Sequence, residues 1–306
     1  AKLREIQDKQ AAQEFKVDAG WAFYDPAVKH CPFGMASWYK EGGVPNAMLI
    51  TPQKQPPPIV ARTFEEQVGA LIRPSRPKAP YKLFAIPFSK AADNVLMREA
   101  VVRLSADGSA QIDVSEQAKG QTDLDRREIY VGKTNEEMRA ALVAELKGTV
   151  PDARVVSAAF EGIDAFDGTP TIRYSLAWPA LAVVAGDRMV LAPSLFGAPA
   201  SNPFTVQTRR TAVHFPHTQK TVDRITFEIP QGYAIGELPG ASIVREGPFV
   251  LVTNFARDSG KLVFSRRLEI DVAMWPVDQY PLLKKFFERA QQADRVVVTL
   301  AKEPPS

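Results

Sequence analysis

The chain contains one cysteine and three histidines, so any nucleophilic chemistry must be built from very few groups. Catalysis by cysteine needs a thiolate, an imidazole within hydrogen-bond reach and a further polar group that orients the imidazole. His30 and Cys31 are adjacent, and Asp25 lies shortly before them. Because neighbouring residues of an extended chain point to opposite sides, we interpret Cys31 as a small thiol packed in a loop. We therefore expect no catalytic residue here.

A metal site is the second kind of chemistry to consider. His214 and His217 occur in VHFPHT, where a spacing of three could bring two imidazoles together. A stable zinc site uses three or four protein ligands, and no third histidine lies nearby. We predict structural or solvent-facing imidazoles and no metal. Gly42-Gly43 lacks the spacing of a phosphate-binding loop, so no cofactor is expected either.

Aromatic side chains are concentrated between Trp21 and Tyr39. Trp21, Trp38 and Tyr39 could form a surface for a sugar or a peptide, or these rings could pack the segment against a core. Basic pairs, by contrast, are scattered, which is typical of solvated strand faces and not of a nucleic-acid track. They are Arg126-Arg127, Arg209-Arg210 and Arg266-Arg267.

The overall composition is that of a folded globular protein, with 45% apolar and 24% charged residues. Lysine and arginine number 38 against 35 acidic residues, and a net charge of +3 is too weak to attract nucleic acid. No apolar run approaches about 18 residues, so we expect no membrane span. A length of 306 residues indicates two or three domains, and the start at Ala1 favours a fragment of a longer protein.

The N-terminal part is expected to be irregular. Residues 14–25 are typical of a hairpin, and residues 26–43 of an ordered loop. Prolines recur from residue 51 to residue 87, and they disfavour a continuous helix or a central strand. We therefore predict an extended arm in residues 1–50 and a proline-rich linker in residues 51–93.

Residues 94–200 are predicted to form an α+β middle domain. A hairpin is expected from 95–104 and 110–114, because Asp107-Gly108 supplies a tight turn. Thr134 and Glu137 form a capping box, and the apolar residues Met138, Leu142 and Leu146 follow at helical spacing. Further strands are expected at 154–160, 171–178 and 188–191.

Residues 201–306 are predicted to form a C-terminal domain, separated by the loop 193–203. Alternation of apolar and polar residues indicates half-buried antiparallel strands, with a turn at 257–260 and a last strand at 296–300. Asp278 is expected to cap a helix whose apolar stripe is Leu282, Leu283, Phe286, Phe287 and Ala290. The predicted fold class is α+β, mainly β, with antiparallel β-sandwich-like domains, each covered by one or two helices.

The segment WAFYDPAVKHCPFGM, residues 21–35, resembles the end of the transglutaminase-like core of large exported bacterial proteins. The C-terminal third is similar to the β-rich domain of unknown function that follows this core, and the resemblance covers most of the chain. Its marks are Arg209-Arg210, His214-Phe215-Pro216, Ile229-Pro230-Gln231-Gly232-Tyr233, Leu238-Pro239, Arg266-Arg267, Tyr280-Pro281, Phe286-Phe287 and Ala293-Asp294.

The resemblance implies a Cys, His and Asp triad, and Asp25 is the only position that matches it. The family's histidine precedes this aspartate, but residues 1–24 contain no histidine, and Cys31 follows Asp25 in the wrong order. Asp25 can also be a turn residue before Pro26. The resemblance further implies a periplasmic or cell-surface location.

Three functional hypotheses remain. The first is a non-catalytic accessory region that docks against a degenerate core and contacts a protein or glycan, including the upstream part of the same protein. The alternative is part of an active cysteine protease or transglutaminase whose nucleophile lies upstream, which would require an upstream Cys opening a helix and a His before Asp25. A weaker alternative is a carbohydrate-binding module, which would require Trp21, Trp38 and Tyr39 exposed on one face.

Overall fold

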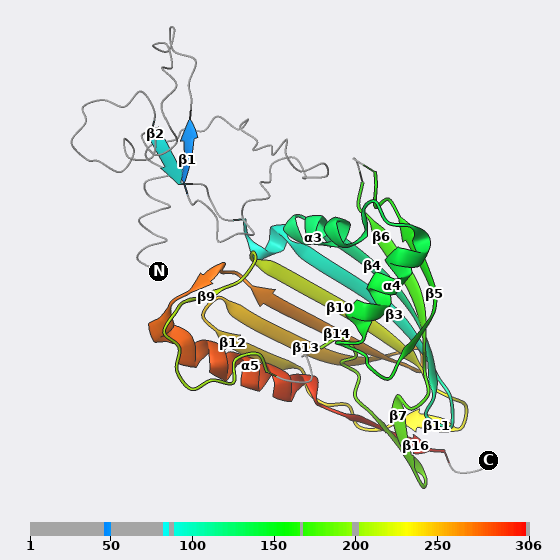
Figure 1. Cartoon of the computed structure of the whole chain (residues 1–306). Helices are drawn as coiled ribbons and strands as arrows, with labels where there is room; N and C mark the ends of the chain where they lie inside the picture. Colours follow the sequence, from blue (N-terminus) through cyan, green and yellow to red (C-terminus); the bar gives the residue numbers. More distant parts are fainter. Residues whose placement is uncertain (1–45, 50–81, 86–88, 166–167, 198–201, 304–306) are drawn as a thin grey trace. The chain divides into compact units, whose positions relative to one another are not determined.

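The computed structural model describes residues 46–49, 82–85, 89–165, 168–197 and 202–303, which belong to two compact units (Figure 1). In the first unit, β1 (Asn46–Leu49) pairs antiparallel with β2 (Lys82–Ala85). The linker predicted for residues 51–93 was expected to contain no central strand. β2 lies within these residues, in a sheet of only two described strands, so it is an edge strand there. The predicted hairpin and loop and the residues Trp21, Asp25, His30, Cys31, Trp38 and Tyr39 lie outside the described residues.

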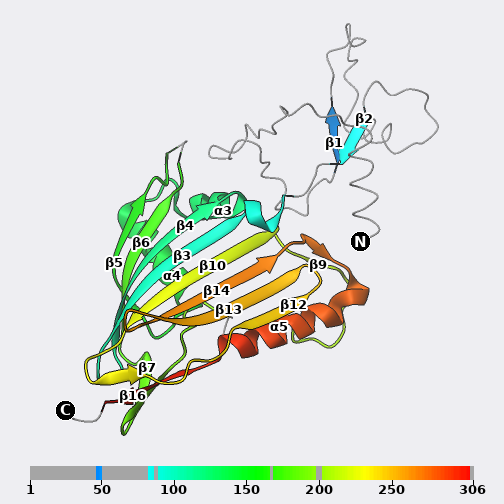
Figure 2. The ribbon, with the colours of Figure 1, turned by 180° about the vertical axis from the view of Figure 1, so that it is seen from behind.

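The second unit is built on an eight-stranded sheet (Figures 1 and 2). Neighbouring strands are antiparallel except for β10 and β3, which run parallel. This confirms the predicted fold class of α+β, mainly β, with antiparallel sheets. In spatial order the strands are β12 (Ser242–Glu246), β13 (Phe249–Asp258), β14 (Lys261–Ile270), β10 (Gln219–Glu228), β3 (Val95–Leu104), β4 (Ala110–Lys119), β6 (Thr171–Trp178) and β5 (Arg154–Glu161).

Two hairpins of this sheet follow directly from their turn residues. Gly108 has a φ of 86° in the turn between β3 and β4, where glycine has no Cβ to clash. Ser259 and Gly260 both have positive φ in the two-residue turn between β13 and β14. Both predicted turns are confirmed, and β4 continues to Lys119, five residues beyond its predicted end at residue 114.

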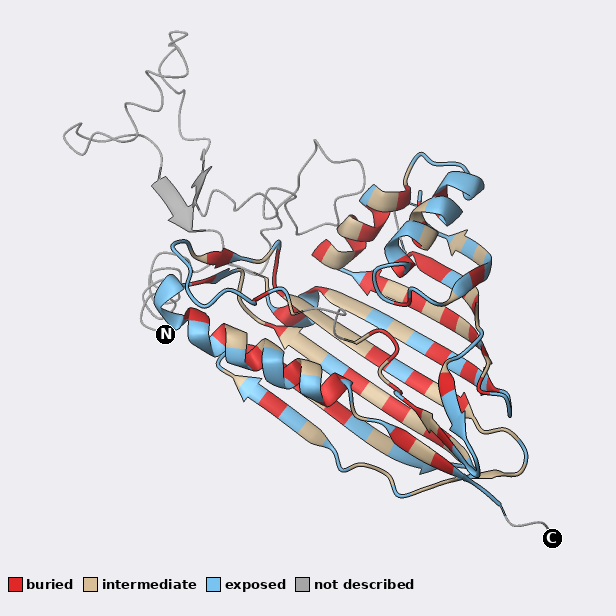
Figure 3. Cartoon of the chain, turned by 60° about the horizontal axis from the view of Figure 1, so that its bottom comes forward, coloured by how far each residue is buried: buried red, intermediate tan, exposed pale blue. Residues whose placement is uncertain are grey.

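One face of the large sheet is covered, as the alternation of buried and exposed residues along its strands shows (Figure 3). Three helices and a second sheet lie on this covered face: α3 (Gln121–Tyr130), α4 (Asn135–Leu146), α5 (Tyr280–Asp294) and a four-stranded sheet. The other face is left without a covering element among the described residues, and we call it the open face.

The four-stranded sheet has the order β11 (Tyr233–Ile235), β16 (Val298–Lys302), β8 (Arg188–Leu191) and β7 (Ala182–Ala185). Its inward residues Met189, Leu191 and Leu300 join the first core, together with α4 and the strands β3, β4, β6 and β10. A separate, second core lies under α5. Smaller elements are β9 (Val213–His214), which pairs with β15 (Met274–Trp275), and the 3₁₀ turns η2 (Ala91–Asp93) and η3 (Val277–Gln279).

The helices agree only in part with the sequence prediction. Helix α4 has the predicted capping box, with Thr134 accepting from the Glu137 backbone, and its three apolar positions are buried. For α5, the predicted cap Asp278 lies within η3, and Leu282 is 43% exposed, so the predicted stripe was wrong at this residue. Among the described residues, no helix is long and apolar enough to cross a membrane.

Strands of the predicted α+β middle domain, 94–200, and of the predicted C-terminal domain, 201–306, lie in one continuous sheet. The parallel pairing of β3 with β10 joins them, from Val95 opposite Lys220 to Arg103 opposite Glu228. Local sequence patterns do not report such a pairing, because the two strands are far apart in the chain. The boundary itself stays a prediction, since a shared sheet does not say whether either half folds alone.

Candidate functional site

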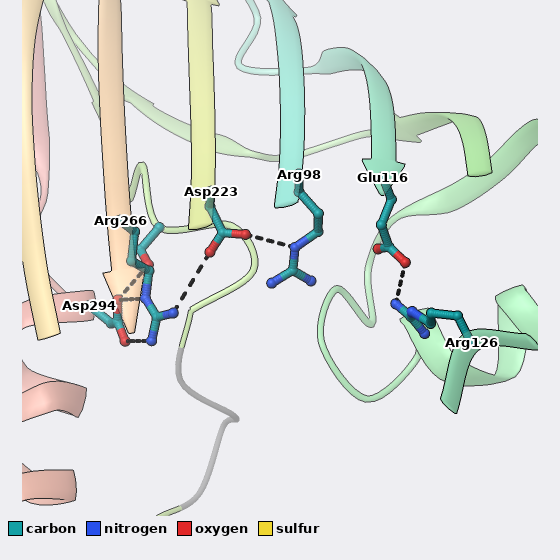
Figure 4. A network of polar contacts seen from close by, with 7 residues as sticks. Arg98, Glu116, Arg126, Asp223, Arg266 and Asp294 are labelled. Atoms are coloured by element: carbon teal, nitrogen blue, oxygen red, sulfur yellow. Dashed lines mark hydrogen bonds and ion pairs between the residues drawn. The ribbon is translucent and has the colours of Figure 1, made fainter. Parts of the chain in front are cut away.

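A row of charged side chains crosses the covered face of the large sheet. Glu116, Arg98, Asp223 and Arg266 are register partners on the consecutive strands β4, β3, β10 and β14. Register partners point to the same face, so these four side chains meet between sheet and helices. Arg126 from α3 and Asp294 from α5 extend the row at its two ends (Figure 4). We call these six residues the charge row.

Positive and negative groups alternate along the charge row. Arg126 Nη2 lies 2.5 Å from Glu116 Oε1, and Arg98 Nε donates to Asp223 Oδ1 at 2.7 Å. Arg266 binds Asp294 through two parallel hydrogen bonds of 2.7 and 2.9 Å. Such forked arginine–carboxylate pairs are the strong type, because both partners are ionised and their geometry is fixed. The row is therefore held by three close ion pairs.

The charge row is buried. Asp223 is 1% exposed, and the side chains of Glu116 and Arg266 are 4% and 5% exposed. Burial raises the pKa of Glu116, and the positive charges of Arg126 and Arg98 oppose this rise. Burial also disfavours the charged form of Arg98, but Asp223 and Glu116 outweigh it and its pKa is raised. Buried ions are tolerated only when compensated in this way.

The charge row lies between the two apolar cores. On β14, Phe264 belongs to the first core and Ile270 to the second, and Arg266 lies between them on the same face. The Phe196 ring also lies 4.6 Å from the Arg98 guanidinium carbon. The row thus links the strands at the junction of the cores and attaches one helix at each end.

Helix α3 adds a second buried polar cluster beside Arg126. Arg126 Nη1 lies 2.5 Å from Glu145 Oε1 on α4, and the Tyr130 hydroxyl donates to Glu145 Oε2 at 3.3 Å. Burial raises the pKa of Tyr130 and of Tyr174, so both phenols stay protonated near neutral pH. These groups can orient one another, but they are poorly suited to exchange protons with a substrate.

The open face of the sheet carries a groove of about 560 Å³. Its lining combines apolar residues, such as Val101 and Ala159, with small hydroxyl side chains and charges of both signs: Ser115, Ser157, Ser175, Thr226, Glu99, Asp113, Arg173 and Arg224. The Ser175 hydroxyl donates to Asp113 at 2.7 Å, and Arg103 lies at the same distance. These two contacts, the first most strongly, lower the pKa of Asp113. The groove is therefore a mixed polar and apolar surface with a fixed carboxylate.

The two described histidines have different environments. His217 is buried, with Nε2 2.8 Å from Asp125 Oδ2 and Nδ1 2.7 Å from the Thr218 carbonyl oxygen. His214 is exposed on β9. This agrees with the prediction of structural or solvent-facing imidazoles. Among the described residues, no group of three or more His, Cys, Asp or Glu side chains could hold a metal ion.

The sequence prediction missed the charge row. Arg126 and Arg127 are buried on α3 and Arg266 is buried on β14, so the prediction of solvated strand faces was wrong for these three arginines. Arg267 on β14 is 44% exposed, as predicted. Arg209 and Arg210 are exposed as predicted, outside any strand. A signal was present, because Arg266 has the same alternation phase as the apolar Phe264 and Leu268. A charge in an apolar phase indicates a buried ion pair.

Comparison with known proteins gives limited matches. Residues 187–300 match a domain of unknown function with a solved structure, DUF3858, over fewer than half of the chain's residues. No curated protein matches the sequence significantly. The matched family is not described as a transglutaminase, so that resemblance stays a prediction.

One solved structure that is similar to the chain comes from Parabacteroides distasonis and is described as a "putative protease". The sequence identity is 10%, and the likeness covers 38% of this chain and 24% of that chain. The matched region thus spans about a quarter of the length of that structure. With a TM-score of 0.31, the likeness carries no argument about fold or activity.

Proposed function

We propose that this chain is a non-catalytic accessory region of an exported, transglutaminase-like protein, and that the groove on its open face binds the upstream part of the same protein. The observation that carries the proposal is the contrast between the two faces of the sheet. The covered face is filled by two cores and the paired charge row. The open face carries a groove of mixed polar and apolar lining that no described element fills.

The side chains of the groove favour a protein as its occupant. Ser115, Ser175 and Ser157 are small side chains on three neighbouring strands, and they leave a shallow floor that side chains of another surface can fill. Arg173 and Glu99 give its walls both signs of charge. A glycan surface would offer an exposed ring, whereas the lining residue Tyr174 is 3% exposed and belongs to the first core.

The chain connection supports a partner within the same protein. The segment that resembles the end of a transglutaminase-like core, residues 21–35, precedes the described body, which starts at residue 89. Two binding surfaces in one polypeptide meet at an effective concentration set by the chain between them, of order millimolar when that connection is short. A groove of modest size is then sufficient for stable docking.

The experiment fills the groove and measures binding to the polypeptide encoded directly before Ala1. Ser157→Trp on β5 should weaken binding, measured by isothermal titration calorimetry, by at least about tenfold. Asn254→Trp is the matched control, because Asn254 is exposed on the same face but outside the groove, and it should bind like the wild type. Wild-type affinity in Ser157→Trp would exclude the groove as the docking site.

The competing hypothesis of an active cysteine enzyme is tested separately. Peptide hydrolysis and glutamine acyl transfer should both be absent in the chain and in its Cys31→Ala variant. Turnover that Cys31→Ala abolishes would overturn the non-catalytic assignment. An upstream sequence with a Cys opening a helix and a His shortly before Asp25 would favour a split active site instead.

A further inference from the structure

Arg266 has two acidic partners of unequal quality. Asp294, on the last turn of α5, binds it through two hydrogen bonds of 2.7 and 2.9 Å. Asp223, on the neighbouring strand β10, approaches the same guanidinium with an Oδ2 to Nη1 distance of 3.7 Å (Figure 4). The second contact is an ion pair without a hydrogen bond. Arg266 thus forms a two-bond salt bridge with Asp294 and only a longer ion pair with Asp223.

Asp223 has a hydrogen-bond acceptor that no described donor reaches. Its Oδ1 accepts from Arg98 Nε, whereas its Oδ2 is buried and has no hydrogen-bond partner among the described residues. A buried carboxylate oxygen without a donor is costly, and a small turn of the Arg266 guanidinium would supply one. Arg266 therefore lies beside a second carboxylate oxygen that has no donor.

The last turn of α5 is the part of the helix that depends most on the ion pair. Leu283 and Phe286 anchor the first half of α5 in the second core, and both are fully buried. The apolar residues that the second half buries are Ala290 and Ala293, which offer far less apolar area. Asp294 and its bonds to Arg266 and to the Ser194 hydroxyl hold this end against the sheet.

We propose that Asp223 is a standby partner for Arg266, which lets the C-terminal turn of α5 leave the sheet without leaving a buried guanidinium uncompensated. When Asp294 moves away, Arg266 turns toward Asp223 Oδ2 and keeps a carboxylate partner. The anchored half of α5 stays in place. The segment between Ala290 and β16 is then a movable end on an otherwise fixed sheet, and its position is controlled by one exchange of ion pairs.

A double-mutant cycle tests the exchange in the full chain. Asp294→Asn alone should raise the equilibrium constant of unfolding modestly, because Asp223 replaces the lost partner. Asp223→Asn combined with Asp294→Asn should raise it by at least about tenfold more than the product of the two single effects, because Arg266 then has no carboxylate. The control combines Asp294→Asn with Asp113→Asn on the open face, where the effects should multiply. Multiplying effects in the Asp223 and Asp294 pair would overturn the proposal.

A second measurement does not depend on the stability of the double variant. In Asp294→Asn alone, hydrogen exchange should accelerate at least about tenfold in residues 290–294, while residues 283–287 and the strand amides around Arg266 stay protected. Faster exchange on β14 as well would mean that Arg266 is left uncompensated, and it would contradict the standby role.

Discussion

Arg127 Nη2, on α3, donates to the carbonyl oxygen of Gly168, 41 residues further along the chain, at 2.9 Å. Its Nη1 donates to the carbonyl oxygens of Gly162, Ile163 and Ala165, and its Nε to Asp123. One guanidinium therefore organises the loop between β5 and β6.

Replacing Arg127 by lysine should destabilise the fold by about 3 kcal/mol, because an ammonium cannot reproduce the fork and buried carbonyls lose their donors. Arg173→Lys is the control, since Arg173 and its partner Glu161 are both more than half exposed, and such pairs contribute less than about 1 kcal/mol. Urea midpoints measure the difference. Equal midpoints would show that the loop does not depend on Arg127.

Helix α5 should behave as a structural cover of the sheet. Phe286→Ala should cost about 3 to 5 kcal/mol, because the side chain is fully buried in the second core, and Phe287→Ala should cost less, because Phe287 is half-buried. Arg289→Ala, on the exposed side, should be nearly silent. If Phe286→Ala instead left the denaturant midpoint unchanged and abolished association with a partner, α5 would be a docking element.

Gly108 should tolerate no side chain. A Cβ at this position would lie 2.2 Å from the Ala182 carbonyl oxygen, where the β3–β4 turn meets the start of β7. Gly232 has a similar positive φ but nothing within 4 Å, so Gly232→Ala should cost only the backbone strain of about 1 kcal/mol. Gly108→Ala should cost about 2 kcal/mol more. Thermal unfolding of the two variants isolates the close contact, and equal losses would exclude it.

The pH dependence of stability should carry opposite contributions from two carboxyl groups. Burial raises the pKa of Glu116 above its usual 4.5, so the folded state binds this proton more tightly than the unfolded state. Its contribution to stability falls as pH rises from about 4.5 to the raised pKa. Glu116→Gln should therefore become more stable relative to the wild type across this window.

Asp113 should behave in the opposite way. The Ser175 hydroxyl and then Arg103 lower its pKa, so its contribution is present above about 3.8, its usual value, and is lost as pH falls through the lowered pKa. Asp113→Asn should cost stability at neutral pH and little in strong acid. Urea unfolding of both variants between about pH 3 and 8 tests the signs, and a Glu116→Gln advantage that shrinks with rising pH would contradict them.

Cleavage in the predicted loop 193–203 should not separate the chain into independent halves. The shared pairs of β3 and β10, and the Arg98–Asp223 bond between them, cross this boundary. Limited proteolysis should yield two bands on a denaturing gel and one species in native gel filtration. Two species under native conditions would show that the predicted boundary separates autonomous domains.

Much of the fold could be predicted because its signals are local. The β3–β4 hairpin and α4 depend on turn and capping residues a few positions apart, and β13 and β14 on alternation with a tight turn. Helix α3 was not predicted, because the residues that it buries, such as Asp123 and Arg126, are mostly polar and give no apolar stripe. Pairs formed across the sheet determine which polar residues are buried.

The candidate site shows the same limit. Glu116, Asp223 and Arg266 each occupy an apolar phase of their strands, so the sequence marks them as unusual. Which of them pair depends on the register of β4, β3, β10 and β14, which only the assembled sheet defines. The groove on the open face likewise combines small residues from separate strands.

The parallel contact of β3 with β10 also sets an order of events during synthesis. Arg98 leaves the ribosome 125 residues before Asp223, which at about 5 to 20 residues per second is a delay of roughly 10 seconds. Until β10 arrives, the β3–β4–β6–β5 half has an unpaired edge strand, and Arg98 lacks its Asp223 partner. Such long-range closure is slow and exposes aggregation-prone edges.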